Sequence, residues 1–161
     1  MGYLLNQRAT HMGTRSNIAV LELDGTVEMI YVHWDGHIEH NGVMLHKHYN
    51  DEDKVRELVS KGNISTLAER IAPFSYESHS WAKAYHGVTV FYGRDRKDPE
   101  QEAVKYDTLD EATKDMEEFM YVFNVAHQVW MVKPEGCVPM LLEEAIAKMG
   151  DDEEDDEEDY E

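Results

Sequence analysis

Apolar and polar residues alternate in several short stretches of the chain, a pattern that is typical of β-strands. The first stretch is an apolar run from Asn17 to Leu23, and Asp24-Gly25 supplies a two-residue turn before the next run, Val27 to Trp34. Alternation along the second run gives two faces, one of Ile30, Val32 and Trp34 and the other of Met29, Tyr31 and His33, and both are expected to be at least partly covered. We therefore predict a β-hairpin, followed by a tight exposed loop from His37 to His40.

Helical spacing replaces this alternation in three places, each with a start signal and an end signal. The first helix is predicted between Asn50 or Asp51 and Gly62, the second from the capping box of Thr108 and Glu111, and the third between Pro139 and Gly150. Their apolar stripes are Val55, Leu58 and Val59, then Ala112, Met116 and Phe119, and finally Leu142, Ala145, Ile146 and Met149.

The shorter elements complete the prediction. Ile64 to Ile71 is expected to form a short helical turn, and three further strands are expected over residues 88–92, 121–125 and 128–132. Residues 74–87 and 94–105 are expected to be loops. Hairpin-connected strands with helices between them predict an α+β fold, with a mostly antiparallel sheet and about three helices packed on one face.

The chain of 161 residues is long enough for one domain with a real core. We expect a flexible lead-in over residues 1–12, in which Met12 could be an alternative start, a single domain over 13–150 and a disordered polyacidic tail over 151–161. The tail contains ten acidic residues, and without it the chain has 24 acidic and 15 basic residues. The net charge of -19 is therefore about -9 in the body, which disfavours direct nucleic-acid binding.

The location predicted from the sequence is the cytoplasm. The N-terminus lacks an apolar signal core, and no stretch approaches eighteen consecutive apolar residues. The single cysteine, Cys137, fits a reducing compartment and is expected to be half-buried before the third helix. Nothing near it in the sequence supplies a catalytic base.

A cluster of histidines offers one candidate site. His33, Asp35 and His37 lie close together, and imidazole with carboxylate is a common ligand set for zinc and other divalent ions. The spacing is not that of a known zinc motif, so turn and surface histidines are the alternative, and no cofactor is predicted. The metal-ligating candidates are His33, His37, His40, His46 and His48.

A second candidate is the segment Tyr92-Gly93-Arg94-Asp95-Arg96, expected at the end of a strand. Two guanidinium groups can clamp a phosphate or a carboxylate, because each offers a planar fork of donors. They can equally form ion pairs with Asp95 and other acids. The glycine-rich loops of the common nucleotide-binding folds are missing, so an enzyme is not the favoured interpretation.

The acidic tail is the third candidate, as a partner-binding segment. A flexible polyanion can dock on a basic surface with fast, salt-dependent association, although it can also serve solubility alone. Its aromatic end is similar to the acidic tails of phage single-stranded-DNA-binding proteins, whose basic groove this chain lacks. The tail residues in question are Asp151, Asp152, Glu153, Glu154, Asp155, Asp156, Glu157, Glu158, Asp159 and Tyr160.

Several motifs together resemble a family of small uncharacterised proteins from tailed bacteriophages, prophages and bacteria. The resemblance covers roughly residues 12–132, and its last part is Tyr121 with Phe123 and Trp130. The other matching segments are Gly13-Thr14-Arg15-Ser16, Tyr31-Val32-His33-Trp34-Asp35-Gly36, His40-Asn41-Gly42, Leu45 with His48-Tyr49, Gly62-Asn63-Ile64-Ser65-Thr66-Leu67 and Tyr92-Gly93-Arg94-Asp95-Arg96. The resemblance implies a phage or prophage origin and a shared polar site, and it implies no reaction.

From the two polar motifs of this family pattern we expect one pocket for a small anionic ligand, formed by His33, Asp35, Tyr92, Arg94 and Arg96. The leading functional hypothesis is a phage accessory protein that binds a basic surface of a host or phage protein of nucleic-acid metabolism or defence, as an inhibitor or host-takeover factor. One alternative is an enzyme or sequestering protein for a nucleotide-like anion, with or without a metal. Another is a tail-regulated binder of single-stranded nucleic acid. Homo-oligomer formation stays open.

Overall fold

The predicted hairpin forms the centre of the sheet. The structure is a computed structural model that describes residues 13–73 and 87–159, with side chains described up to Gly150. Strand β1 (Ser16–Leu21) pairs antiparallel with β2 (Val27–Val32), in a register that sets Ser16 opposite Val32. The turn through Asp24 and Gly25 joins them, as the sequence predicted; Asp24 accepts a hydrogen bond from the Thr26 backbone N–H at 2.9 Å.

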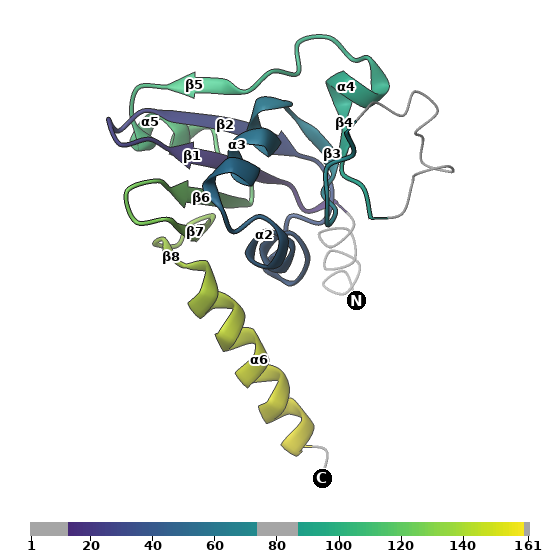
Figure 1. Ribbon diagram of the computed structural model, residues 1–161. Helices are drawn as coiled ribbons and strands as arrows, with labels where there is room; N and C mark the ends of the chain where they lie inside the picture. Colours follow the sequence, from purple (N-terminus) through teal and green to yellow (C-terminus); the bar gives the residue numbers. More distant parts are fainter. Residues whose placement is uncertain (1–12, 74–86, 160–161) are drawn as a thin grey trace.

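The other strands extend this hairpin into one eight-stranded mixed sheet, mostly antiparallel, in an α+β fold (Figure 1). The strand order is β4-β3-β2-β1-β6-β7-β8, with β5 on the same edge of β2 as β3. Two pairings are parallel, β1 with β6 and β2 with β3. The added strands are β3 (Ile64–Thr66), β4 (Val90–Phe91), β5 (Val104–Tyr106), β6 (Phe119–Asn124), β7 (Val129–Pro134) and β8 (Met140–Leu141).

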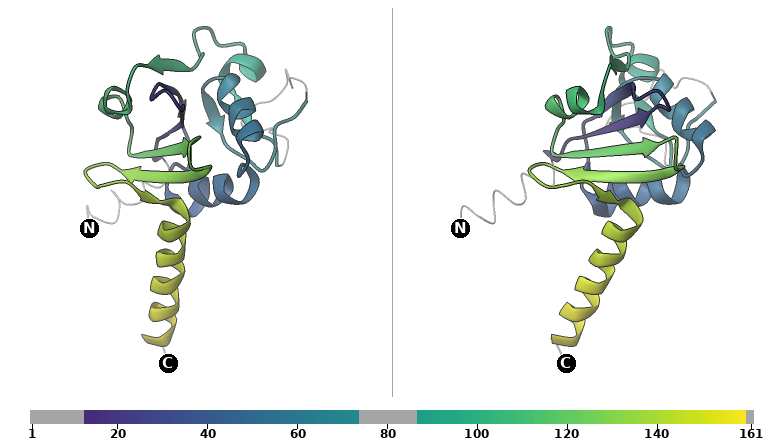
Figure 2. Two further views of the ribbon diagram at one scale, coloured as in Figure 1. Left: turned by 60° about the vertical axis from the view of Figure 1, so that its left-hand side comes forward. Right: turned by 90° about the vertical axis from the view of Figure 1, so that its left-hand side faces the viewer.

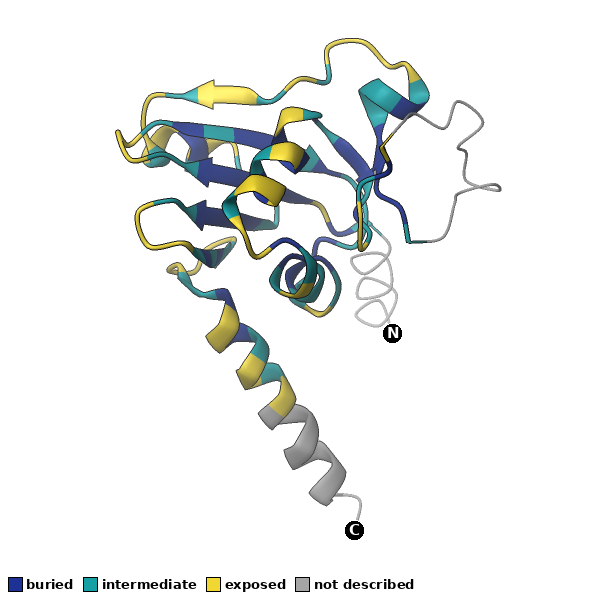
Figure 3. Ribbon diagram, in the orientation of Figure 1, coloured by how far each residue is buried: buried dark blue, intermediate teal, exposed yellow. Residues whose placement is uncertain are grey.

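Both faces of the sheet are covered, so the expectation of helices on one face is wrong. Side chains alternate along β1, and Ile18 and Val20 enter the larger core while Ala19 enters a smaller one. The larger core is covered by α2 (Val43–His48), α3 (Glu52–Ser60) and the start of α6 (Leu142–Asp159), and the smaller core by α5 (Leu109–Lys114). The central strands are accordingly buried along most of their length (Figure 3).

The two predicted helix caps are confirmed. Asp51 accepts a hydrogen bond from the Lys54 backbone N–H at 2.9 Å and starts α3, which buries Val55 and Leu58. Thr108 accepts a bond from Glu111 N at 3.2 Å and starts α5. Helix α5 ends at Lys114, earlier than its predicted stripe, because Phe119 already belongs to the central strand β6.

Several short elements differ from the prediction, because tertiary pairing decides short segments whose own preference is weak. Ile64–Thr66 is a strand rather than a helical turn, and Tyr92–Arg96 is a short helix, α4, rather than a strand end. The expected loop His37–His40 is instead the start of a wide helical turn, η1 (Ile38–Gly42), which has His37 as its N-cap and buries Asn41. Residues 1–12 and 74–86, expected to be lead-in and loop, lie outside the described residues.

Helix α6 starts after β8 rather than at Pro139, and it is anchored by the buried side chains of Leu142 and Ala145. Its helical backbone passes Gly150, the predicted end, and continues to Asp159. An anchored helix propagates at little cost, and one glycine costs only about 1 kcal/mol relative to alanine. Like-charge repulsion opposes the helix beyond Gly150, so the disordered tail expected in solution over residues 151–161 stays a prediction.

No helix in the described part of the chain has the length and apolar character needed to cross a membrane.

The turn that follows β2 lies directly on the start of β1. The Gly36 backbone N–H donates to Thr14 O at 2.9 Å, and the buried Tyr121 hydroxyl donates to Gly36 O at 2.6 Å. The Asn41 side chain, also buried, donates to Trp34 O at 3.1 Å and to Ser16 Oγ at 3.3 Å. We call this arrangement the Gly36 turn; it ties β1, β2, η1 and β6 together.

Replacing Gly36 with alanine should lower the free energy of unfolding by about 1–3 kcal/mol, the usual cost of overpacking. A methyl group there would lie 2.8 Å from the Arg15 carbonyl carbon and from Ser16 Cβ, and backbone atoms cannot move aside easily. Chemical denaturation measures the change. Gly13→Ala is the matched control, because nothing lies within 4 Å of its added methyl; equal stability of the two variants would show that the close approach is not maintained in solution.

Candidate functional site

The two polar motifs singled out in the sequence meet at the end of β2. Asn63 joins them, because its side chain accepts from Tyr31 N at 2.8 Å while its backbone carbonyl accepts from Tyr92 N at 3.1 Å. The His33 backbone N–H continues the ladder to Ile64 O at 3.0 Å. Helix α4, which starts at Tyr92, is thereby held beside the strand that carries Tyr31 and His33.

Arg15 enters the same region from β1. Ser16 is opposite Val32 in the antiparallel ladder, so the preceding residue, Arg15, comes opposite His33. The Tyr31 hydroxyl is 2.7 Å from His33 Nδ1, and the His33 ring meets the Trp34 ring edge-on with centroids 4.5 Å apart. A tyrosine of β2, the histidine just after β2 and the exposed arginine just before β1 thus come together at one end of the hairpin.

The two arginines of α4 do different things. Arg96 lies over the Tyr92 ring, with its guanidinium carbon 5.6 Å from the ring centroid. Arg94 instead donates to both carboxylate oxygens of Asp95, at 3.1 and 3.3 Å, and to Ala72 O at 2.6 Å. Asp95 is itself buried and accepts from Phe91 N at 2.9 Å. Arg94 therefore stabilises the fold by the ion pairing that was the alternative in the sequence, and it is not a free ligand clamp.

Asp35 takes part in the Gly36 turn through its backbone. Its φ is 57°, and its carbonyl accepts from Asn41 N at 3.2 Å. Within residues 13–73 and 87–150, no hydrogen bond or ion pair joins its carboxylate to His33 or Arg96. Of the five predicted pocket residues, the structure brings together His33, Tyr92 and Arg96. It adds Arg15 and Tyr31, which we group with those three as the Arg15–Arg96 cluster.

The charge of this cluster comes from its arginines. Burial lowers the pKa of His33, and the nearby guanidinium groups of Arg15 and Arg96 lower it further. Burial raises the pKa of Tyr31, against the opposing effect of Arg15. At neutral pH the imidazole and the phenol are therefore both uncharged, and each can give or accept a hydrogen bond.

The five candidate histidines lie within the described residues, and they are not grouped as metal ligands there. Among the described residues, no group of three or more His, Cys, Asp or Glu side chains is arranged to hold an ion. His46 and His48 lie on α2, where residues two apart face different directions, and His40 Nδ1 is 2.8 Å from the Asn41 side-chain oxygen. The ring centroids of His37, at the N-cap of η1, and His40, within η1, are 6.4 Å apart.

Cys137 is exposed in the loop between β7 and β8, so the half-buried position expected for it is wrong.

The acidic run follows the anchored start of α6, which leaves the sheet and extends away from the body (Figures 1 and 2). Side chains 151–161 lie outside the described part.

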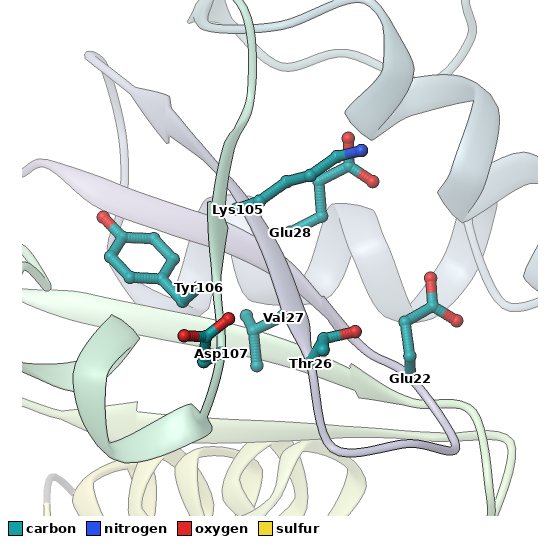
Figure 4. Close-up of a pocket in the computed structure, with 7 residues that line it drawn as sticks. All are labelled: Glu22, Thr26, Val27, Glu28, Lys105, Tyr106 and Asp107. Carbon is teal, nitrogen blue, oxygen red and sulfur yellow. The ribbon is translucent and has the colours of Figure 1, made fainter.

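A separate hollow of about 270 Å³ opens between the β1–β2 hairpin and β5 (Figure 4). It is lined by Glu22, Thr26, Val27, Glu28, Lys105, Tyr106 and Asp107. Glu22 is engaged by Arg56 at 2.7 Å, and Lys105 is the cross-strand neighbour of Glu28. Its three carboxylates and one ammonium give it the opposite character to the Arg15–Arg96 cluster.

Comparison with known proteins gives no match among family models, curated proteins or solved structures. The phage-family resemblance inferred from sequence motifs therefore stays a prediction.

The His33 imidazole should titrate below the ordinary histidine pKa of about 6.5. Arg15→Gln and Arg96→Gln should each raise this pKa, because each substitution removes a positive charge that disfavours imidazolium. NMR titration of the ring protons measures the pKa directly. Lys97→Gln, which removes an exposed charge just after α4, is the control; if the arginine variants shift the pKa no more than this control, the two guanidinium groups do not act on His33.

Proposed function

We propose that the protein works by binding, and that its acidic C-terminal arm, residues 142–161, docks on a basic surface of another protein. The observation that supports this most is the root of α6: Leu142 and Ala145 are buried in the main core, and the helix packs on η1 and β7. The ten acidic residues of the tail follow that fixed root. The anchored root therefore fixes the point at which the acidic residues follow the body.

The partner suited to such an arm is a protein with a cationic groove or patch, such as the surface of a nucleic-acid-binding protein. Opposite charge accelerates encounter, and closely spaced carboxylates approach the charge density of a polynucleotide. The phage-family resemblance favours a host or phage protein of nucleic-acid metabolism or defence. The body charge of about -9 supports protein binding over nucleic-acid binding.

Removing residues 151–161 should weaken partner capture roughly tenfold or more at low salt, equivalent to at least about 1.4 kcal/mol. The immobilised full chain, the deletion and a variant with every tail Asp and Glu changed to Asn and Gln are compared in host lysate at low and physiological salt. Mass spectrometry identifies the captured proteins, and one purified partner then gives the affinities. The amide variant separates charge from length.

Capture that is unchanged in both variants would contradict the proposal and leave the tail as a solubilising segment. Binding of single-stranded DNA that becomes stronger after deletion would instead support the tail-regulated nucleic-acid binder, because a competing polyanion would have been removed.

A further inference from the structure

We infer that the Arg15–Arg96 cluster is a binding site for a phosphoryl group, in a region of the molecule separate from the acidic arm. The cluster consists of Arg15, Tyr31, His33, Tyr92 and Arg96, and three segments distant in sequence bring it together. Nothing in this inference depends on the arm.

The two guanidinium groups of the cluster are the first reason. In a chain of net charge -19, Arg56 pairs with Glu22 and Glu52, and Arg94 pairs with Asp95. Neither Arg15 nor Arg96 forms an ion pair with a carboxylate of the described residues. Two such forks beside one histidine provide the donors that the terminal oxygens of a phosphate monoester accept.

The Tyr31–His33 pair adds a neutral donor. Tyr31 Oη and His33 Nδ1 are 2.7 Å apart, and in the tautomer in which the hydroxyl donates to Nδ1 the ring carries its proton on Nε2. That N–H is then a donor for an anion, without the cost of an additional buried charge. Arg96, stacked over the Tyr92 ring, has a restricted position from which to bind.

A buried hydroxyl supplies an independent observation. Ser65 has no exposed surface, and its Oγ has no hydrogen-bond partner within the described part of the chain. Ser65 lies beside the cluster through its backbone: it follows Ile64, whose carbonyl accepts from His33 N at 3.0 Å, and its own carbonyl accepts from Trp34 N at 3.1 Å. An unsatisfied buried hydroxyl is rare in a folded protein and costs free energy unless a ligand or water completes it.

Two acidic residues near this site weaken its attraction for an anion, although neither forms an ion pair with Arg15 or Arg96 in the described part of the chain. The Glu118 carboxylate accepts from the Arg15 backbone N–H at 3.2 Å, and the Glu117 carboxylate raises the pKa of Tyr31. Glu117 lies near enough to repel an anion. Its removal should strengthen binding, whereas loss of either arginine should weaken it.

The test follows the His33 ring signals by NMR while inorganic phosphate, adenosine 5′-monophosphate or adenosine is added to the full chain. A saturable shift with phosphate, and an equal or larger one with the monophosphate, is expected. Arg15→Gln and Arg96→Gln should each weaken the affinity roughly tenfold or more, as expected for charge-assisted hydrogen bonds. Glu117→Gln should strengthen it, and Lys97→Gln should leave it unchanged.

The probes also identify the source of the phosphoryl group. Equal affinity for phosphate and the monophosphate supports a site for the phosphoryl group alone, and tighter binding of the monophosphate supports a nucleotide-like ligand. No saturable shift with either phosphate-bearing probe overturns the inference. So does binding that adenosine reproduces, or that folded Arg15→Gln and Arg96→Gln variants retain unchanged. The same titration is repeated on the chain without residues 151–161. Phosphate binding that persists in this deletion is independent of the acidic arm, whatever the outcome of the partner-capture experiment.

Discussion

The structure depends on the close approach of the Gly36 turn to the first residues of β1. Only glycine fits at Gly36, because any side chain would meet the Arg15 backbone and Ser16 Cβ at 2.8–2.9 Å. Burial raises the pKa of Tyr121, so its hydroxyl stays protonated and donates to Gly36 O at 2.6 Å. Asn41, with no exposed surface, satisfies a second carbonyl of the turn. These buried polar contacts are costly to break, since each would leave a backbone group without a partner.

Both regions for which we propose a function are positioned by this turn. It fixes the end of β2, where Tyr31 and His33 face Arg15 and α4. It also leads into η1, where an added methyl at Gly42 would lie 3.3 Å from Leu142 Cδ1 and 3.4 Å from the Tyr121 ring. The start of α6, from which the acidic arm extends, therefore packs against the same residues that position the Arg15–Arg96 cluster. The two regions of opposite charge share one scaffold while remaining distinct surfaces.

The sequence predicts what local signals decide. The Asp24-Gly25 hairpin, the Asp51 and Thr108 caps and the shared face of Tyr31 and His33 all follow from neighbouring residues. The strand at Ile64–Thr66 could not be predicted, because three residues carry no reliable period and parallel pairing with β2 is a tertiary event. Within the candidate site, only the strand register brings Arg15 opposite His33. Arg94 likewise donates to the carbonyl of Ala72, a residue twenty-two positions away, in addition to its pairing with the adjacent Asp95.

The most direct test of this account is Tyr121→Phe, which removes one hydroxyl and keeps the ring. We predict a loss of about 1–2 kcal/mol in the free energy of unfolding, together with displaced NMR signals of the His33 ring. Tyr49→Phe is the matched control, because its hydroxyl also donates to a carbonyl, Ala68 O at 2.6 Å, away from the turn; it should lower stability and leave the His33 signals in place. Unchanged His33 signals in Tyr121→Phe would contradict the claim that the Gly36 turn positions the cluster.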